Sequence, residues 1–208
     1  MIKGYIEREK LYKLVDNKLA ELGITEDDYP LNSRAIAESI GSNLIVEYHK
    51  FPSNKMGGIL YKGDELSSMA LNTLRSEKGQ NFDCMHELIH YWFHPPGKMF
   101  CIDSNYIHQN PGREWQANEG AAQALMPKDL FIRKYIEFRG NVSALSDFFM
   151  VGELSVEFRI NNLKLSPPRP KYEEYDNLWF LPDSIETINS NYDDLLDFDD
   201  ENDMFIPF

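Results

Sequence analysis

Residues 76–97, SEKGQNFDCMHELIHYWFHPPG, form an apolar-periodic segment that predicts one helix ending at Pro95 and Pro96. Within it His86 and His90 are four residues apart, so a helix places both imidazoles on one face, one turn apart. Any partner of this pair must therefore lie against the same helix face. The two histidines could simply be core residues, but their spacing also suits two ligands of one metal ion.

The chemistry of zinc fits this spacing. Zinc takes neutral imidazole nitrogens at about 2.0–2.1 Å, and a helical four-residue repeat supplies two of them without loop strain. Glu87, next to the first histidine, is then placed to act as general base on a water molecule. The pattern His-Glu-x-x-His should arise by chance on the order of once per hundred chains of this length, so alone it is only moderately specific for a metal site. A third ligand elsewhere in the sequence would make the assignment stronger.

Residues 110–127, NPGREWQANEGAAQALMP, predict a second helix with Asn110 as its cap and Pro127 as its stop. Glu114 and Asn118 are four residues apart and share one face of that helix. We therefore expect Glu114 to be the third metal ligand. We expect Asn118 to accept a hydrogen bond from a ligand histidine and so to fix its tautomer.

Other readings of these residues stay open. Glu119 is a rival ligand, but it lies five positions from Glu114 and points away from that face, so both cannot serve and Glu114 is favoured. Glu114 could also be an ordinary first-turn glutamate, favoured by the helix dipole. His94 continues the histidine row just before Pro95, where a helix-end or supporting role is favoured over metal ligation. Gly120, within the helix, predicts close packing on another backbone.

The two segments HELIH at 86–90 and EWQANEGAAQALMP at 114–127 resemble the signatures of the ImmA/IrrE family of zinc metallopeptidases. The second signature of that family is roughly E-x-x-A-N-x-F-A-x-x-L-L-M-P. Order, separation and the terminal Leu-Met-Pro all fit, and the resemblance covers about residues 1–165. The departures are Gly120 in place of Phe and Ala124 in place of Leu, which affect packing and remove no ligand.

The resemblance implies a cytoplasmic zinc endopeptidase, often encoded on a phage or mobile element and often acting on a helix-turn-helix repressor. Carried over by position, it makes His86, His90 and Glu114 the metal ligands and Glu87 the catalytic base. The expected partner is a protein substrate, an Xre-type repressor. The alternative is a zinc-containing sensor that sequesters a repressor without cutting it; a toxin or antitoxin component is a third. Mn²⁺ or Fe²⁺ could also occupy such a site.

Three short apolar or alternating runs predict a small antiparallel sheet; they span residues 42–51, 56–63 and 67–74. With the helices they indicate an α+β fold in which zincin-like helices carry His-Glu-x-x-His. The predicted organisation is a zincin-like metallopeptidase domain at 1–128, a C-terminal helical subdomain at 129–165, and a proline linker with an acidic tail at 166–208.

The helical subdomain has the rhythm of a helix-turn-helix between residues 144 and 163. Its second helix offers Glu153 and Glu157 against only Arg159 before Lys164, which is poor for contacts with phosphates. Direct DNA binding is therefore disfavoured, and a role in packing against the catalytic body or holding a substrate repressor is favoured.

Charge separates the end of the chain from the rest. Residues 172–208 hold 12 acidic and no basic residues, which leaves 22 acidic against 21 basic elsewhere. Aromatic residues are mixed into this tail, so it is either disordered or a docking segment that folds over the body, occupies the cleft as an autoinhibitor, or mimics nucleic acid. Two cysteines and a charged N-terminus without an apolar run predict a cytoplasmic protein with no membrane association.

Two expectations concern the surroundings of the site. Residues 98–109, KMFCIDSNYIHQ, are expected to form a polar loop between the two helices. Tyr106, His108 and Arg113, in or beside this loop, are candidate donors to an oxyanion. The aromatic run that follows His90 is expected to pack in the core; it consists of Tyr91, Trp92 and Phe93.

Overall fold

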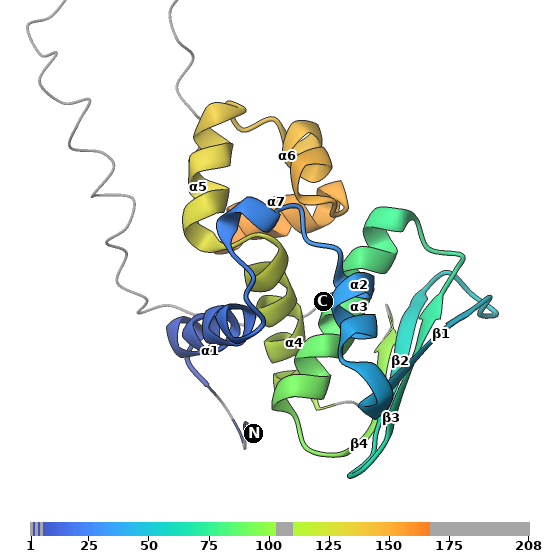
Figure 1. Cartoon of the computed structure of the whole chain (residues 1–208). Coiled ribbons are helices and arrows are strands. Elements are labelled where there is room, and N and C mark those ends of the chain that lie inside the picture. Colours follow the sequence, from blue (N-terminus) through green and yellow to red (C-terminus); the bar gives the residue numbers. More distant parts are fainter. Residues whose placement is uncertain (1, 3, 5, 103–109, 167–208) are drawn as a thin grey trace, which may run out of the picture. The chain divides into compact units, whose positions relative to one another are not determined.

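The computed structural model describes residues 2, 4, 6–102 and 110–166, and for residues 98–102 only the backbone. The elements follow one another along the chain (Figure 1): α1 (Arg8–Glu21), η1 (Glu26–Asp28), α2 (Ser33–Ser39), η2 (Gly41–Asn43), β1 (Leu44–His49), β2 (Met56–Lys62), β3 (Ser67–Asn72), α3 (Glu77–Phe93), β4 (Gly97–Ile102), α4 (Pro111–Leu125), α5 (Lys128–Glu137), α6 (Val142–Phe149) and α7 (Glu153–Asn162). None of these helices is long and apolar enough to cross a membrane.

The chain divides into two units, residues 1–164 and residues 165–208, and the helices and strands named above all lie in the first. The predicted acidic tail at 172–208 lies outside the described residues, as do Tyr106 and His108. The predicted division of the first unit at residue 128 stays a prediction.

The class is α+β, with a four-stranded sheet in the order β1-β3-β2-β4 among the described residues. Strand β2 is antiparallel to both β3 and β4. The prediction of a wholly antiparallel sheet is wrong at β1, which runs parallel to β3, with Leu44 opposite Ser67 and His49 opposite Asn72. The parallel pair arises because β3 inserts between β1 and β2, so the chain leaving β1 must pass the end of β3.

Asn72, at the end of β3, holds the segment that connects β1 to β2 through hydrogen bonds of its side chain. Its side chain is fully buried, and its Oδ1 accepts a hydrogen bond from the Phe51 amide at 3.2 Å. Its Nδ2 donates to the carbonyls of Ser53 and Met56 at 2.8 and 2.7 Å. The polar backbone of the crossing segment is thereby satisfied in the interior, and β2 can start on the far side of β3.

The expectation of a polar loop at residues 98–109 is wrong for its first half, where the structure has strand β4. Residues 97–102 pair with β2 at the edge of the sheet, so the first half of the predicted polar loop at 98–109 is a strand. The pairing is made by backbone groups of segments about forty residues apart, which the local composition of the loop does not reveal. Residues 103–109 lie outside the described residues.

Helix α3 is the centre of the first unit, with the sheet on one side and α4 on the other (Figure 1). Its start and the starts of α2 and α4 follow the sequence: Ser76, Asn32 and Asn110 accept hydrogen bonds from the first turns of their helices. Helix α1 then packs against α4. Helix α3 thus lies between two layers, the sheet and helix α4.

The sheet approaches α3 through two glycines of β2. A Cβ atom at Gly57 would lie 2.4 Å from the Asp83 Cγ, and one at Gly58 would lie 3.2 Å from the Glu87 Cγ. Asp83 and Glu87 are one turn apart, so this face of α3 rests directly on the backbone of β2. Because the two glycines let β2 cover this face of α3, helix α4 must pack on a different face.

Candidate metal centre

Helix α3 and the residue that caps its C-terminus, His94, place three histidines in a row at four-residue intervals. The ring centroids of His86 and His90 are 4.8 Å apart, and those of His90 and His94 are 4.7 Å apart. Their exposed fractions are 2%, 1% and 0%, so all three imidazoles are withdrawn from water. The sheet covers one side of α3, and the histidine row meets groups from the first half of α4.

Glu114, in the first turn of α4, completes a cluster with two of these histidines. Its Oε2 lies 3.3 Å from His86 Nε2, and its Oε1 lies 3.5 Å from His90 Nε2. The two Nε2 atoms are 3.0 Å apart. One ligand atom from each of the three residues lies within 4.8 Å of the others, an arrangement that could hold a metal ion. The Glu114 side chain is 23% exposed, so the cluster is not sealed on its side.

The electrostatics of the cluster are coupled. Burial would raise the pKa of Glu114, but its contacts with the imidazoles of His86 and His90 lower it to about 2. Burial lowers the pKa of His90 to about 4. Burial also works to lower the pKa of His86, yet the contact with Glu114 and the charges of Glu87 and Glu114 outweigh it, so this pKa is raised. An anionic carboxylate and two imidazoles thus converge where a cation would be stabilised.

Asn118 lies one turn after Glu114, and its Oδ1 is 2.9 Å from His86 Nδ1. This is the hydrogen bond expected of an asparagine on the Glu114 face of the helix. With Nδ1–H donating to Asn118, the lone pair of His86 is on Nε2, which points towards Glu114 and His90.

Glu87 is fully buried between α3 and β2, below Gly58. It lies close enough to His86 for its charge to raise the pKa of that imidazole. The structure therefore places the predicted base beside the first histidine, on the sheet side of α3.

Glu119, the rival ligand, is engaged elsewhere. Its Oε2 accepts a hydrogen bond from the Tyr12 hydroxyl at 2.8 Å, and its Oε1 accepts one from Asn162 Nδ2 at 2.5 Å. Arg8 Nε lies 3.4 Å from the same carboxylate. Of the two glutamates, the structure brings Glu114 and not Glu119 to the histidines.

Sequence reasoning missed Gln116. Its Oε1 lies 2.9 Å from His94 Nε2, and His94 Nδ1 lies 2.8 Å from His90 Nδ1. Gln116 is 2% exposed. It is two positions from Glu114 and so lies off the face that carries Glu114 and Asn118; no local pattern links it to a histidine 22 residues earlier.

Gly120 lies at the contact of α4 with α3, as expected of a close helix pair, but it meets the side chain of Ile89 and not a backbone. A Cβ atom there would lie 3.0 Å from the Ile89 Cγ2, so the missing side chain lets the two helices approach. This contact is one residue before His90 and brings the two halves of the cluster together.

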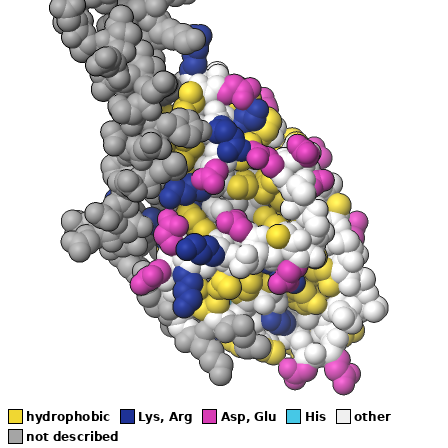
Figure 2. Space-filling view, turned by 60° about the vertical axis from the view of Figure 1, so that its left-hand side comes forward, with side chains coloured by type: hydrophobic (Ala, Val, Ile, Leu, Met, Phe, Trp, Pro, Cys, Tyr) yellow, Lys and Arg dark blue, Asp and Glu magenta, His cyan; other side chains and the backbone are white. Residues whose placement is uncertain are grey.

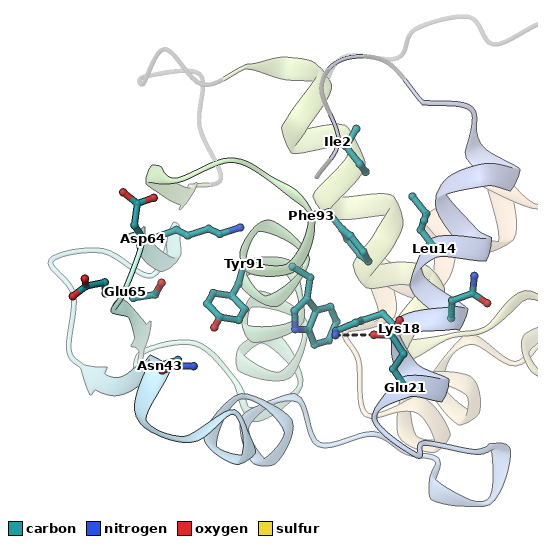
Figure 3. Close-up of a pocket in the computed structure, with 14 residues that line it drawn as sticks. Ile2, Leu14, Lys18, Glu21, Asn43, Asp64, Glu65, Tyr91 and Phe93 are labelled. Carbon is teal, nitrogen blue, oxygen red and sulfur yellow. Dashed lines mark hydrogen bonds and ion pairs between the residues drawn. The ribbon is translucent and has the colours of Figure 1, made fainter.

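A separate cleft of about 730 Å³ lies at the end of α3 (Figure 3). Tyr91 and Phe93 line it together with Leu14 of α1, and the Lys18–Glu21 ion pair lies at its wall. The expectation that the aromatic run 91–93 packs in the core is wrong, because these side chains are only half-buried. They project from sides of α3 other than the side that carries the histidine row.

Comparisons with known proteins bear on this geometry. The family model for the IrrE N-terminal-like domain, Peptidase_M78, matches residues 43–161. No curated protein matches the chain. Among solved structures, a Mycobacterium tuberculosis transcriptional regulator is similar, with a TM-score of 0.56 and 16% sequence identity over 80% of this chain. The match covers 50% of that protein, so this chain spans about half its length, and at this identity the likeness shows a shared fold.

The family match takes in the sheet, both helices of the cluster and all three of its residues, His86, His90 and Glu114. It extends over more than half of the sequence. The chain therefore belongs to the Peptidase_M78 family, whose members share the IrrE N-terminal-like domain.

Proposed function

We propose that this chain is a zinc-dependent endopeptidase that cuts a specific protein in the cytoplasm, an Xre-type helix-turn-helix repressor of a phage or mobile element. The observation that carries the proposal is the convergence of His86 Nε2, His90 Nε2 and a Glu114 oxygen within 4.8 Å. The family supplies the class of reaction, a metallopeptidase.

The donor set fits zinc. Two imidazole nitrogens and one carboxylate are the protein ligands of a His₂Glu catalytic site, which leaves a further position for water or substrate. Each histidine presents Nε2 to the centre, because its Nδ1 faces a hydrogen-bonding partner. His86, His90 and Glu114 would therefore hold the ion, which would supply Lewis acidity towards the scissile carbonyl and the attacking water.

Glu87 would act as the base of this reaction. Its position beside His86 suits it to take a proton from the attacking water and to pass that proton to the leaving amine. Burial below Gly58 leaves its carboxylate few directions in which to move. A general base of this kind contributes roughly 10²–10⁴-fold to the rate.

Two observations weigh against direct DNA binding and leave a protein as the proposed substrate. Arg159, the basic residue of the recognition-like helix α7, is 1% exposed and directed inward, so it is not available to phosphates. On the face that Figure 2 shows, Lys and Arg side chains alternate with Asp and Glu among apolar atoms. A repressor, itself basic where it binds DNA, is a chemically reasonable partner for such a mixed surface.

The first test is metal content. Elemental mass spectrometry of the purified chain should give about one zinc per molecule, as expected for one His₂Glu site. His90→Ala and Glu114→Ala should lose it while they stay folded, and His49→Ala, at an exposed histidine of β1, should retain it. A wild-type chain that takes up no metal after zinc addition would contradict the proposal.

The second test distinguishes cleavage of a repressor from its sequestration without cleavage. Sequestration is the alternative function, and the similar solved structure is described as a transcriptional regulator. The zinc-loaded chain is incubated with the helix-turn-helix repressors encoded nearest its gene, and products are read by mass spectrometry. Glu87→Gln should abolish cleavage while leaving zinc content and repressor binding intact. A repressor that is bound equally by both proteins and cut by neither would favour the sequestering function.

A further inference from the structure

We propose that His94 and Gln116 are positioning residues that hold His90 in the tautomer with its lone pair on Nε2, facing His86 and Glu114. The inference deepens the proposed metal centre and rests on it. It follows from the direction of three consecutive hydrogen bonds.

The chain of bonds starts at the N-terminal segment. Gln116 Nε2 lies 2.7 Å from the Gly4 carbonyl oxygen, and only the amide nitrogen of the glutamine can donate there. This orients the glutamine side chain, so its Oε1 is the atom that faces His94 Nε2 at 2.9 Å. An amide oxygen is only an acceptor, so His94 must carry its proton on Nε2.

The second bond transmits that choice to His90. With its proton on Nε2, neutral His94 has its lone pair on Nδ1, which lies 2.8 Å from His90 Nδ1. His90 must then donate from Nδ1. Its remaining lone pair is on Nε2, 3.0 Å from His86 Nε2 and 3.5 Å from Glu114 Oε1.

Burial and backbone contacts keep the chain of bonds in place. His94 is 0% exposed and Gln116 is 2% exposed, so these polar groups depend on one another. The backbone of His94 is held on both sides: its amide donates to the His90 carbonyl at 3.0 Å, and its own carbonyl accepts from Lys62 Nζ at 2.5 Å. His86 is set in the same sense by Asn118, so each ligand histidine has its own orienting partner.

The test uses the full chain and four variants. His94→Leu and Gln116→Leu break the chain of bonds. His94→Asn restores an acceptor, because Asn Oδ1 is attached to Cγ as His Nδ1 is. Gln123→Leu is the matched control: Gln123 is also a buried glutamine of α4, 3% exposed, and it contacts Arg159 and Asp16 rather than a histidine.

Two quantities are measured. The zinc Kd, by competition with a chromophoric chelator, should rise about 10-fold or more in His94→Leu and Gln116→Leu. In His94→Asn the zinc Kd should return most of the way to the wild-type value. In Gln123→Leu it should stay within about twofold of the wild-type value, whatever that variant does to the Tm. In the zinc-free wild type, ¹⁵N NMR of the imidazoles should show His90 protonated at Nδ1, and Gln116→Leu should mix the two tautomers.

An unchanged zinc Kd in His94→Leu, or an equal loss in Gln116→Leu and Gln123→Leu, would overturn the inference. A wild-type His90 protonated at Nε2 would overturn it as well. A wild type that shows the Nδ1 tautomer yet binds no zinc would instead remove the metal centre and leave the orienting bonds standing, so the two failures are distinguishable.

Discussion

Helix α4 carries two buried polar clusters on different sides, and they differ in how their charges are balanced. We call the first the histidine cluster; it consists of His86, His90, His94, Glu114, Gln116 and Asn118. We call the second the arginine cluster; it consists of Tyr12, Glu119, Gln123, Arg159 and Asn162.

The arginine cluster contains its own cation and its own anion. Arg159 donates from Nη1 to the Tyr12 hydroxyl at 2.6 Å and from Nε to the Met126 carbonyl at 3.1 Å. Tyr12 in turn donates to Glu119. In the histidine cluster, by contrast, imidazole lone pairs and a carboxylate converge, and the described side chains beside the Glu114 carboxylate are two imidazoles. Buried polar residues alone therefore do not identify a binding site. A cluster indicates a site for a cation when its lone pairs and negative charge are not balanced by a cation of the cluster itself.

The largest effect should come from breaking the arginine cluster. Arg159→Met keeps the apolar stem of the side chain but removes the guanidinium, so three buried acceptors lose this donor: the Tyr12 hydroxyl, Gln123 Oε1 and the Met126 carbonyl. A buried acceptor left without its donor costs about 1–3 kcal/mol, so the loss of all three bonds should cost about 3–5 kcal/mol. Urea denaturation of the metal-free chain should show this loss of unfolding free energy, and the folded fraction should still bind one zinc.

Arg133→Met is the control for this prediction. Arg133 pairs with Glu26 on the surface, where both side chains are 44% and 56% exposed. Such a pair contributes about 0–1 kcal/mol, so the variant should unfold close to the wild type. If both arginine variants lost less than about 1 kcal/mol, the contrast between the buried and the exposed arginine would be wrong.

The histidine cluster should respond to metal instead. A ligand that binds only the folded state at about a hundredfold above its Kd stabilises it by about 2.7 kcal/mol. Free zinc should therefore raise the Tm of the wild type and of Arg159→Met, and EDTA should reverse the rise. Glu114→Ala should show no such rise; a rise equal to that of the wild type would place the zinc elsewhere on the chain.

Gly120 joins the two clusters, since it lies next to Glu119 and against Ile89 of α3. Gly120→Ala gains about 1 kcal/mol of helix propensity, but overpacking against Ile89 costs about 1–3 kcal/mol. We expect a net loss of about 1 kcal/mol of unfolding free energy and weaker zinc binding, because α3 and α4 must move apart. Gly112→Ala, where a Cβ would lie 3.3 Å from Asn110 Oδ1 alone, is the comparison. Equal zinc affinity in Gly120→Ala and the wild type would show that helix spacing does not control the site.

The sequence predicted the parts of the site that depend on local geometry. His86, His90, Glu114 and Asn118 each follow from a four-residue spacing on a helix, and the caps and prolines that bound those helices are local too. Burial of Glu119 among distant partners could not be predicted this way, although its direction relative to Glu114 could.

What sequence reasoning missed is set by contacts between distant segments. The partner of Gln116 beyond His94 is Gly4, 112 residues away, and a buried glutamine leaves no periodic pattern. The parallel pairing of β1 with β3 depends on the crossing segment held by Asn72. The pair Gly57–Gly58 lies within the predicted run 56–63, and no local pattern shows that Asp83 and Glu87 rest on these two glycines.

The smallest effect concerns the rim of the arginine cluster. Burial raises the pKa of Asp16, whose Oδ1 accepts a hydrogen bond from Gln123 at 2.8 Å. A carboxyl whose pKa is raised by folding adds stability below its unfolded pKa of 3.8 and loses that contribution as the pH rises through the folded value. Asp16→Asn keeps the acceptor oxygen and removes the titration, so it should be the more stable protein at pH 7. Because the residue as a whole is exposed and screened by solvent, the gain should be within about 0.5 kcal/mol. Urea denaturation at several pH values should show the two proteins converging as the pH falls below about 4; a wild type more stable than Asp16→Asn at pH 7 would mean that the Asp16 charge contributes to the arginine cluster rather than opposing it.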